Sequence, residues 1–335
     1  MKKGITKILS ACVFAFVVFL AAGTQSKAAV NMGVKQTGAG SSYVNLAWDA
    51  QLGAGHYHTQ FSQDGKNWID MDDSSSPSET VYNLTQGASY YARVVAYKDS
   101  HYMGTHVMVG VSETAIVSTE PTEVSGLTQT AAGVNSVSMS WNASAGAASY
   151  VIYGYINYNW TQIGTSATNS ATITGVAATT STRFSVAAVK NVTGGTVTGD
   201  QCSGVEMKAI PIKVSRIAMQ YYWDSLKEAK YIWTDVNNAD GYQYEVKSAN
   251  GKKTYFRATS TSSYTYVKPF PRGIFVKARV RAYVTVGNKV YYGAWSPYTY
   301  HASSKKVTAK RSSNGKKIYL KWKKVSGASG YQVYV

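Results

Sequence analysis

The sequence predicts an all-β protein built as a tandem array of small two-sheet sandwiches. The first observation is a motif that occurs four times, a Trp followed nine residues later by a Tyr, with small and polar residues between them. The pairs are Trp48 and Tyr57, Trp141 and Tyr150, Trp233 and Tyr242, and Trp322 and Tyr331. Successive Trp residues are 93, 92 and 89 residues apart. This period is too long for a solenoid unit and suits a small self-contained β-domain.

The second observation is the alternation around each Trp. From Ser136 to Trp141, apolar residues alternate with serine, the period-2 pattern of a half-buried strand. The small residues that follow make the turn, and Tyr150 and Ile152 begin the next strand. A large aromatic residue that faces a Tyr on the next strand fixes the centre of a two-sheet sandwich. We therefore expect the four Trp–Tyr pairs in cores; the alternative is an exposed sugar-binding platform.

The N-terminus has the features of a cleaved secretory signal. Three lysines precede an apolar run from Ala11 to Ala22, whose 12 residues are fewer than the roughly 20 that a spanning helix needs. Small residues at Ser26 and Ala28 bracket Lys27, which is a typical peptidase exit. We expect a signal peptide over residues 1–28 and a secreted, cell-surface-associated mature chain with no transmembrane span. Cys12 precedes the apolar run, which does not favour a lipoprotein.

Cysteine use supports the same location. Removal of the signal leaves Cys202 alone, so no internal disulfide can form and the domains must depend on their hydrophobic cores. Low cysteine use in a secreted chain favours a bacterial surface over an animal extracellular matrix. Cys202 is expected to be a small buried apolar residue.

A third motif lies in the first repeat. Asp64-Gly65 predicts a hairpin turn, and further on Leu84 is followed by Gly87, Tyr90 and Arg93-Val94. This arrangement resembles the corner between strands E and F of a fibronectin type III domain, with Tyr90 as the corner tyrosine. The resemblance extends over residues 30–335. It implies immunoglobulin-like (fibronectin type III) β-sandwiches, three complete and one truncated, and it is weak evidence of function.

The other repeats match this frame in part. The matching offsets in the third repeat hold Phe270, Gly273, Val276, Arg279 and Val280, with Trp295-Ser296 near the end of the domain. The offsets in the second repeat hold Val176, Thr179, Thr182 and Val186, so both the Gly and the corner Tyr are missing there. No corner hydrogen bond is therefore expected in the second repeat.

Turn chemistry sets the predicted boundaries. Pro121 and Pro211 block strand continuation between the complete repeats. The predicted repeats cover residues 29–120, 121–211 and 212–303, and a partial fourth repeat covers residues 304–335. Short linkers predict a semi-extended rod. The fourth repeat has material for three of seven strands, so we expect a fragment of a longer protein in which Trp322 cannot be buried.

Charge divides the chain into two parts. Residues 30–211 contain 7 basic and 12 acidic residues, whereas residues 212–335 contain 23 basic and 5 acidic ones, with no carboxylate after Glu245. Such an asymmetry concerns partners and solubility, not fold. An exported protein rarely meets nucleic acid, so the expected partners are anionic cell-wall polymers, acidic polysaccharides or anionic lipid headgroups.

The predicted strand F of the third repeat concentrates this charge. Alternation from Phe275 to Val284 places small apolar residues on one face and Lys277, Arg279 and Arg281 on the other. Two interpretations stay open, cross-strand pairing with Glu245 and an anion-binding surface. We expect replacement of the three cations by Ala to leave the melting temperature nearly unchanged. The fourth repeat can extend this surface with Lys305, Lys306, Lys310, Arg311, Lys316, Lys317, Lys321, Lys323 and Lys324.

Exposed aromatic rings can stack on sugars, although strand propensity and cores account for most aromatics in this sequence. The candidates for glycan stacking lie near the end of the third repeat: Tyr291, Tyr292, Tyr298 and Tyr300.

Catalysis has no support in the sequence. There is no nucleophile elbow, Gly-rich phosphate loop or His-Glu-x-x-His motif, and we expect no catalytic residue, cofactor or metal. His56 and His58 share a strand face near His101 and His106, where solvated histidines are favoured over a transition-metal site.

Two functions of different class remain. The first is a non-catalytic extracellular binding or spacer protein of the bacterial surface, whose repeats project or dock on anionic wall polymers or glycans. The alternative is the accessory region of a secreted glycan- or wall-active enzyme whose catalytic domain lies outside this chain.

Overall fold

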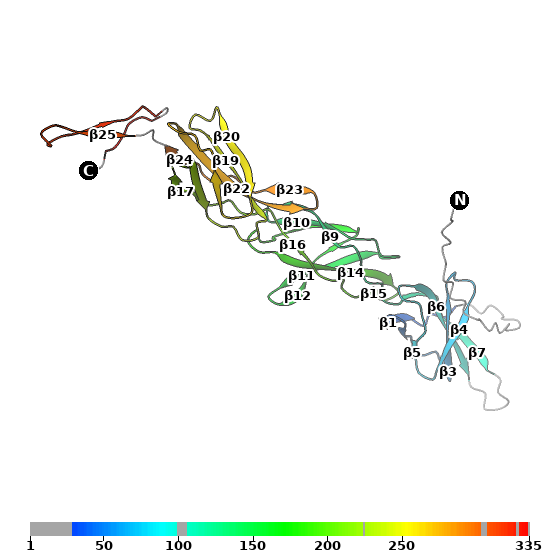
Figure 1. Ribbon diagram of the computed structural model, residues 1–335. Helices are drawn as coiled ribbons and strands as arrows, with labels where there is room; N and C mark the ends of the chain where they lie inside the picture. Colours follow the sequence, from blue (N-terminus) through cyan, green and yellow to red (C-terminus); the bar gives the residue numbers. More distant parts are fainter. Residues whose placement is uncertain (1–28, 99–105, 224, 303–306, 326–327, 334–335) are drawn as a thin grey trace, which may run out of the picture.

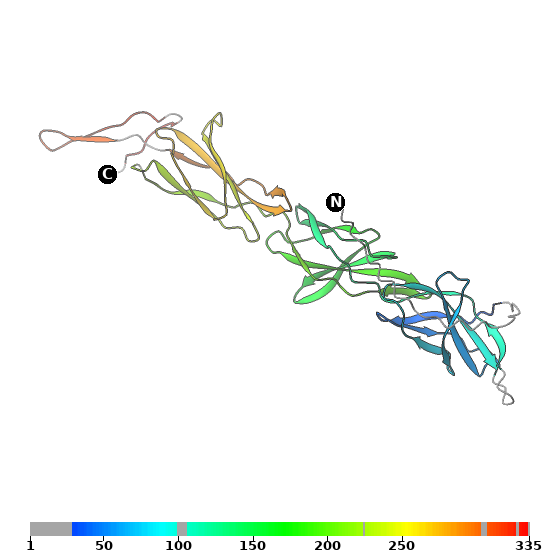
Figure 2. The same ribbon diagram turned by 45° about the vertical axis from the view of Figure 1, so that its right-hand side comes forward.

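The computed structural model describes residues 29–98, 106–223, 225–302, 307–325 and 328–333, and these form strands and loops. Three β-sandwiches follow one another along an elongated rod, with a smaller hairpin near the C-terminus (Figures 1 and 2). The predicted all-β class is confirmed. The predicted signal peptide, residues 1–28, lies outside the described residues.

Repeat 1, the sandwich of strands β1–β8, has two antiparallel sheets. The three-stranded sheet has the order β1 (Lys35–Ala39), β2 (Val44–Ala47), β5 (Ser78–Val81). The five-stranded sheet has the order β4 (Ile69–Ser74), β3 (His56–Ser62), β6 (Ser89–Lys98), β7 (Val107–Val111), and β8 (Ala115–Ser118) also pairs with β6. In the lettering of a fibronectin type III domain, β1, β2 and β5 are strands A, B and E, and β4, β3, β6 and β7 are strands C′, C, F and G. The two sheets thus have the fibronectin type III strand order.

Repeats 2 and 3 have the same order. In repeat 2 the sheets are β13 (Ser170–Thr174), β10 (Ser136–Ser140), β9 (Thr128–Gly133) and β12 (Asn159–Ser166), β11 (Ser149–Ile156), β14 (Thr182–Val192), β15 (Gly195–Thr198), with β16 (Val205–Met207) on β14. In repeat 3 they are β17 (Ile217–Trp223), β18 (Glu228–Trp233), β21 (Tyr264–Val267) and β20 (Thr254–Ser260), β19 (Gly241–Ser248), β22 (Phe275–Val286), β23 (Lys289–Tyr292), with β24 (Thr299–Ala302) on β22. The residue boundaries between repeats stay a prediction.

Each of the first three Trp–Tyr pairs joins the two sheets of its repeat. Trp48, Trp141 and Trp233 are buried, and each ring lies 5.2–5.5 Å from the ring of its Tyr partner. The Tyr hydroxyl accepts a hydrogen bond from the backbone N–H three residues after the Trp. These bonds are Gln51 to Tyr57 (3.1 Å), Ser144 to Tyr150 (3.0 Å) and Val236 to Tyr242 (2.8 Å). The nine-residue spacing is thus the length of chain that lets a Tyr on strand C close the turn it follows.

The fourth pair differs. Strands β25 (Thr308–Arg311) and β26 (Ile318–Lys321) form a two-stranded hairpin whose residues are all exposed. Trp322 contacts Tyr331 at 5.4 Å between ring centroids, and the Val325 N–H donates to the Tyr331 hydroxyl at 2.5 Å. Tyr331 is nevertheless 45% exposed and Trp322 is half-buried, so the assignment of this pair to a core is wrong for the described chain. No second sheet packs on the hairpin among the described residues, which leaves the pair open to solvent.

The repeats contact one another through their F–G hairpins. The tip of the β14–β15 hairpin reaches repeat 1, where the Thr193 N–H donates to the Ile116 carbonyl at 2.7 Å and the Ile116 N–H donates to Thr193 Oγ1 at 2.7 Å. Lys190 is buried at the same junction and donates to the Gly87 carbonyl. Between repeats 2 and 3, Lys208 and Asp240 form an ion pair at 2.8 Å. Paired backbone and buried charge at these junctions favour a stiff rod.

Candidate anion-binding face

The predicted basic stripe lies on the outer face of the five-stranded sheet in repeat 3. Residues of β22 alternate as expected, with Val276, Ala278, Val280, Ala282 and Val284 buried in the core. Lys277, Arg279 and Arg281 point outward, opposite Lys247, Glu245 and Gln243 of β19. Arg257 of β20 lies opposite Glu245 on the other side. Three strands therefore supply one continuous charged face.

Glu245 is the centre of this face. Its carboxylate is fully buried and is bound by Arg279 Nε at 2.6 Å, Arg257 Nη2 at 2.6 Å and Lys247 Nζ at 3.1 Å. Burial alone would raise the pKa of Glu245, but the hydrogen bonds from Arg257, Lys247 and Arg279 hold the pKa at about 2. Glu245 is thus ionised at neutral pH and fixes three cations in position.

Aromatic rings separate the cations along β22. The Arg281 guanidinium lies 3.8 Å from the Tyr292 ring centroid and 4.5 Å from that of Trp295. Arg279 lies 4.3 Å from Trp295 and 4.9 Å from Tyr298, and Lys277 Nζ lies 4.6 Å from Tyr298. We call this alternating stack of Tyr292, Arg281, Trp295, Arg279, Tyr298 and Lys277 the cation–aromatic ladder. Each cation is within the roughly 6 Å over which a ring face attracts positive charge.

Both interpretations of the stripe therefore have structural counterparts. The pairing with Glu245 is present, and a surplus of charge remains, because three cations bind this one carboxylate and the same face also carries Lys277 and Arg281. Arg281 donates to the neutral Gln243 side chain at 2.6 and 3.0 Å, and no described carboxylate forms an ion pair with Arg281 or Lys277. The ring faces and the β19 side chains already hold the cations in place. Less side-chain entropy is therefore lost when an anion binds to them.

The expectation about replacement of the three cations by Ala needs correction. Arg279 donates to a fully buried carboxylate, and its removal would leave that charge with two partners in place of three. Loss of one partner of a buried charge is costly, unlike the loss of an isolated surface charge. Lys277 and Arg281 have no such role.

The predicted glycan-stacking tyrosines are only in part available. Tyr300 is 53% exposed and stacks on Phe275 at 5.8 Å, whereas Tyr291, Tyr292 and Tyr298 are half-buried. Arg281 covers one face of Tyr292, and Lys277 and Arg279 cover Tyr298. These two rings hold cations in the ladder, so the prediction that they are exposed is wrong. Tyr291 donates to the Thr130 carbonyl of repeat 2 at 3.5 Å, next to the repeat junction.

Alternation along β22 does not predict Trp295 and Tyr298 as partners of the cations. Both lie in the segment after β23 that leads into β24, and they reach back across β22. A signal was available in Trp295-Ser296-Pro297-Tyr298, which places two aromatic residues three apart beside a strand with alternating cations. Within the described residues of repeat 1 there is one step of the same kind, in which Arg93 lies 4.1 Å from the Trp68 ring and bonds Gln60 at 2.7 Å.

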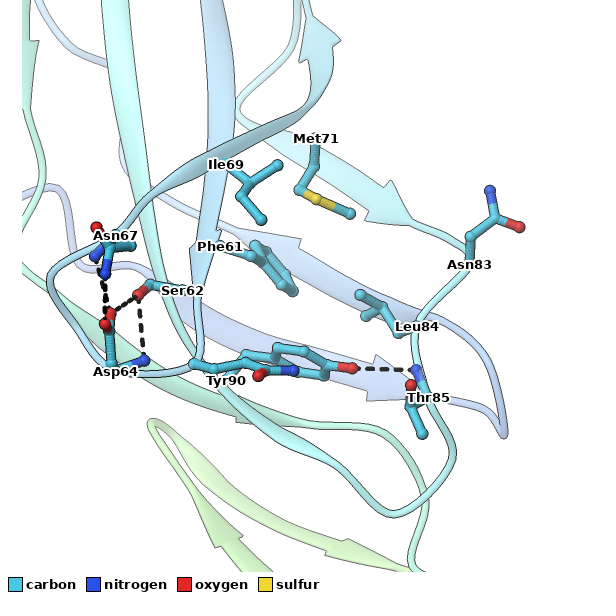
Figure 3. A pocket seen from close by; sticks show the side chains of 11 residues that line it. Phe61, Ser62, Asp64, Asn67, Ile69, Met71, Asn83, Leu84, Thr85 and Tyr90 are labelled. Atoms are coloured by element: carbon cyan, nitrogen blue, oxygen red, sulfur yellow. Dashed lines mark hydrogen bonds between the residues drawn. The ribbon is translucent and has the colours of Figure 1, made fainter. Parts of the chain in front are cut away.

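A hollow at one end of repeat 1 is the other candidate (Figure 3). Its volume is about 760 Å³, and its apolar floor includes Phe61, Met71, Leu84 and Tyr90. Tyr90 makes the expected corner bond there by accepting from the Thr85 N–H at 3.0 Å. The backbone N–H groups of Asn67 and Lys66, with the side chains of Ser62 and Asn67, hold the pKa of the Asp64 carboxyl well below its usual range. Asp64 is therefore committed to its own turn and offers no acid–base chemistry to the hollow.

The histidines of repeat 1 lie together without a metal-binding geometry. The rings of His56, His58 and His106 are 4.7–6.3 Å apart, and His58 Nδ1 is 3.0 Å from Asp73 Oδ1. Across the described ranges, no group of three His, Cys, Asp or Glu side chains could hold a metal ion. His101 lies outside those ranges. Nor does any helix in the described part of the chain have the length and hydropathy to cross a membrane.

Comparisons with known proteins identify no family and no activity. No protein-family profile matches the chain, and no curated protein matches it. Among solved structures, the crystal structure of chicken CNTN1 FN1-FN3 domains is similar at 15% sequence identity, with 82% of this chain and 98% of that chain covered and a TM-score of 0.33. The strand order of each sheet pair defines the chain as tandem fibronectin type III-like β-sandwiches.

Proposed function

We propose that this chain is a non-catalytic extracellular spacer and binding protein of the bacterial surface, which docks on an anionic cell-wall polymer through the outer face of repeat 3. The observation that carries the proposal is the surplus of ordered cations around Glu245. Lys277 and Arg281 are held by rings and a neutral amide, so their charge is available to a phosphate or carboxylate group. A repeating polyanion can engage several such cations at once.

Repeats 1 and 2 have the opposite role. Residues 30–211 carry more acidic than basic residues, and the one ladder-like cation of repeat 1, Arg93, lies on a sheet that also carries Asp70, Asp72 and Asp73. Like charge repels an anionic polymer. The rod then holds repeats 1 and 2 away from the polymer that repeat 3 binds.

The test uses the chain from residue 29 and immobilised poly(glycerol phosphate). The variant Lys277→Gln with Arg281→Gln removes two available cations and leaves the Glu245 cluster intact. The matched control, Lys213→Gln with Arg216→Gln, removes the same charge from two exposed residues at the start of repeat 3. The first variant should bind about tenfold more weakly, which corresponds to about 1.4 kcal/mol. The control should bind like the wild type.

Salt gives the second arm of the test. Screening shortens from about 10 Å at 0.1 M to about 3 Å at 1 M, so wild-type retention should fall steeply over that range. Equal loss in the variant and the control would mean that overall charge, not this face, holds the polymer. Retention that does not change with salt would contradict electrostatic docking and would leave only the spacer role.

A further inference from the structure

A second surface on repeat 3 differs in composition from the equivalent surface of repeat 2. The outer face of its three-stranded sheet carries Tyr221 and Trp223 from β17, Lys230 from β18, and Tyr264 and Tyr266 from β21, which we call the aromatic platform. Trp223, Tyr264 and Tyr266 are 42%, 43% and 47% exposed. These side chains point away from the core that Tyr231 and Trp233 fill, and they belong to the sheet opposite the cation–aromatic ladder.

The platform is built around one ammonium group. Tyr221, Lys230 and Tyr266 form a row across the three strands. Lys230 Nζ lies 5.0 Å from the Tyr264 ring centroid, 5.6 Å from Tyr221 and 5.7 Å from Tyr266. No carboxylate in the described part of the chain forms an ion pair with Lys230. Glu228, at the edge of the face, contacts Lys268 at 3.8 Å instead.

The fold does not require these rings. The equivalent face of repeat 2 presents hydroxyl side chains such as Ser138 of β10 and Thr172 of β13, which bond each other at 2.9 Å. The same sheet therefore forms with an outer face that has hydroxyl side chains in place of aromatic rings. Exposed aromatic residues gathered in one patch, where a related sheet has Ser and Thr, indicate a binding surface.

We propose that the aromatic platform binds a carboxylated polysaccharide, with sugar rings stacked on the aromatic faces and one carboxylate bound to Lys230. A pyranose has apolar C–H faces and polar edges, which matches rings that carry hydroxyl or indole N–H groups at their rims. Two strand spacings separate the rings of β17 from those of β21 by roughly 10 Å, enough for about two sugar units. The single ammonium within the platform supplies charge complementarity for one acidic group.

The experiment measures binding of the chain from residue 29 to polygalacturonate by affinity electrophoresis. Fully methyl-esterified galacturonan serves as the probe with sugar rings but no charge, and inorganic polyphosphate as the probe with charge but no ring. Trp223→Ala should weaken polygalacturonate binding about tenfold, and Trp223→Phe, which keeps a ring, should restore most of it. Lys230→Gln should weaken binding of polygalacturonate and leave binding of the ester unchanged. Tyr82→Ala, an exposed Tyr on repeat 1, is the matched control and should have no effect.

The outcomes separate this site from the anion-binding face. Polyphosphate should respond to the Lys277→Gln, Arg281→Gln variant and not to Trp223→Ala. Polygalacturonate binding that depends on Lys277 and Arg281 but not on Trp223 would overturn the platform and leave the proposed function standing. Absence of polygalacturonate binding, or Trp223-dependent binding to phosphatidylglycerol vesicles in its place, would also overturn it. Near-ultraviolet circular dichroism of each variant verifies that the sandwich is intact.

Discussion

Replacement of Glu245 by Gln should remove both a large part of the stability of repeat 3 and its dependence on acid pH. The buried carboxylate has a pKa of about 2 in place of an ordinary value near 4.5. A shift of this size corresponds to about 3 kcal/mol of folding free energy, because each unit is worth about 1.4 kcal/mol. Since the folded-state pKa is lowered, this stability is present above pH 4.5 and is lost as pH falls toward 2.

The variant should therefore destabilise repeat 3 by about 3 kcal/mol at pH 7, because three cations lose their shared anion. Between pH 4.5 and pH 2 the wild type should converge on the variant. Glu228→Gln is the matched control, since Glu228 pairs at 3.8 Å with Lys268, whose side chain is 55% exposed, and this long pair should contribute less than about 1 kcal/mol.

Hydrogen exchange measured by mass spectrometry provides the assay, because it reports the opening of each repeat separately. Peptides from β22 should lose protection in the variant, whereas peptides from β14, the same strand of repeat 2, should not change. Protection must be expressed relative to the intrinsic exchange rate at each pH. If β22 in the variant keeps the acid-dependent loss of protection seen in the wild type, Glu245 is not the group responsible.

Three further predictions follow from the contacts. Tyr150→Phe should destabilise repeat 2 by about 1–3 kcal/mol, because the Ser144 N–H loses its acceptor. Urea unfolding should detect this loss of stability, and a change below about 0.3 kcal/mol would mean that water replaces the hydroxyl. Arg279→Ala should lower the melting temperature of repeat 3 more than Lys277→Ala does, because of these two residues it is Arg279 that binds Glu245. Equal shifts in calorimetry would contradict the structure. Strands β25–β26 should exchange their amides faster than β22, since no second sheet covers them, and slow exchange there would contradict the exposed hairpin.

The fold could be predicted because its signals are local. The Trp–Tyr spacing of nine residues contains a strand end, a turn and the start of the next strand, so it predicts the connection between the two sheets of each complete repeat without knowledge of the other strands. The hydrogen bond from the turn to the Tyr hydroxyl could have been inferred from the same constancy of spacing, since a purely apolar contact would accept Phe.

The site could be predicted only in part. Alternation along β22 predicts the outward direction of Lys277, Arg279 and Arg281. The position of Glu245 on the neighbouring strand C predicts that it pairs with these cations. The positions of Trp295 and Tyr298 depend on how the segment after β23 crosses β22, and this tertiary arrangement decides which rings are covered. The sequence therefore predicts that the tyrosines near the end of repeat 3 are exposed. In the structure, Tyr292 and Tyr298 instead hold cations.

The aromatic platform has a signal in the sequence. Tyr221 and Trp223, and again Tyr264 and Tyr266, are two residues apart on short strands, so each pair must share a face. The sequence could not assign that face to solvent or core, because Tyr231 and Trp233 show the same spacing on the buried side. Pairing of β17, β18 and β21 resolves it.

Lysine footprinting on the polymer-bound chain tests the proposed function most directly. The chain from residue 29 would be acetylated with and without poly(glycerol phosphate), and each lysine quantified by mass spectrometry. Lys247 and Lys277 should be protected at low salt and lose that protection at 1 M salt, while Lys66 on repeat 1 and Lys213 outside the face keep their reactivity. Unchanged modification of Lys247 and Lys277 in the bound chain, or protection spread equally over all four lysines, would contradict docking through this face.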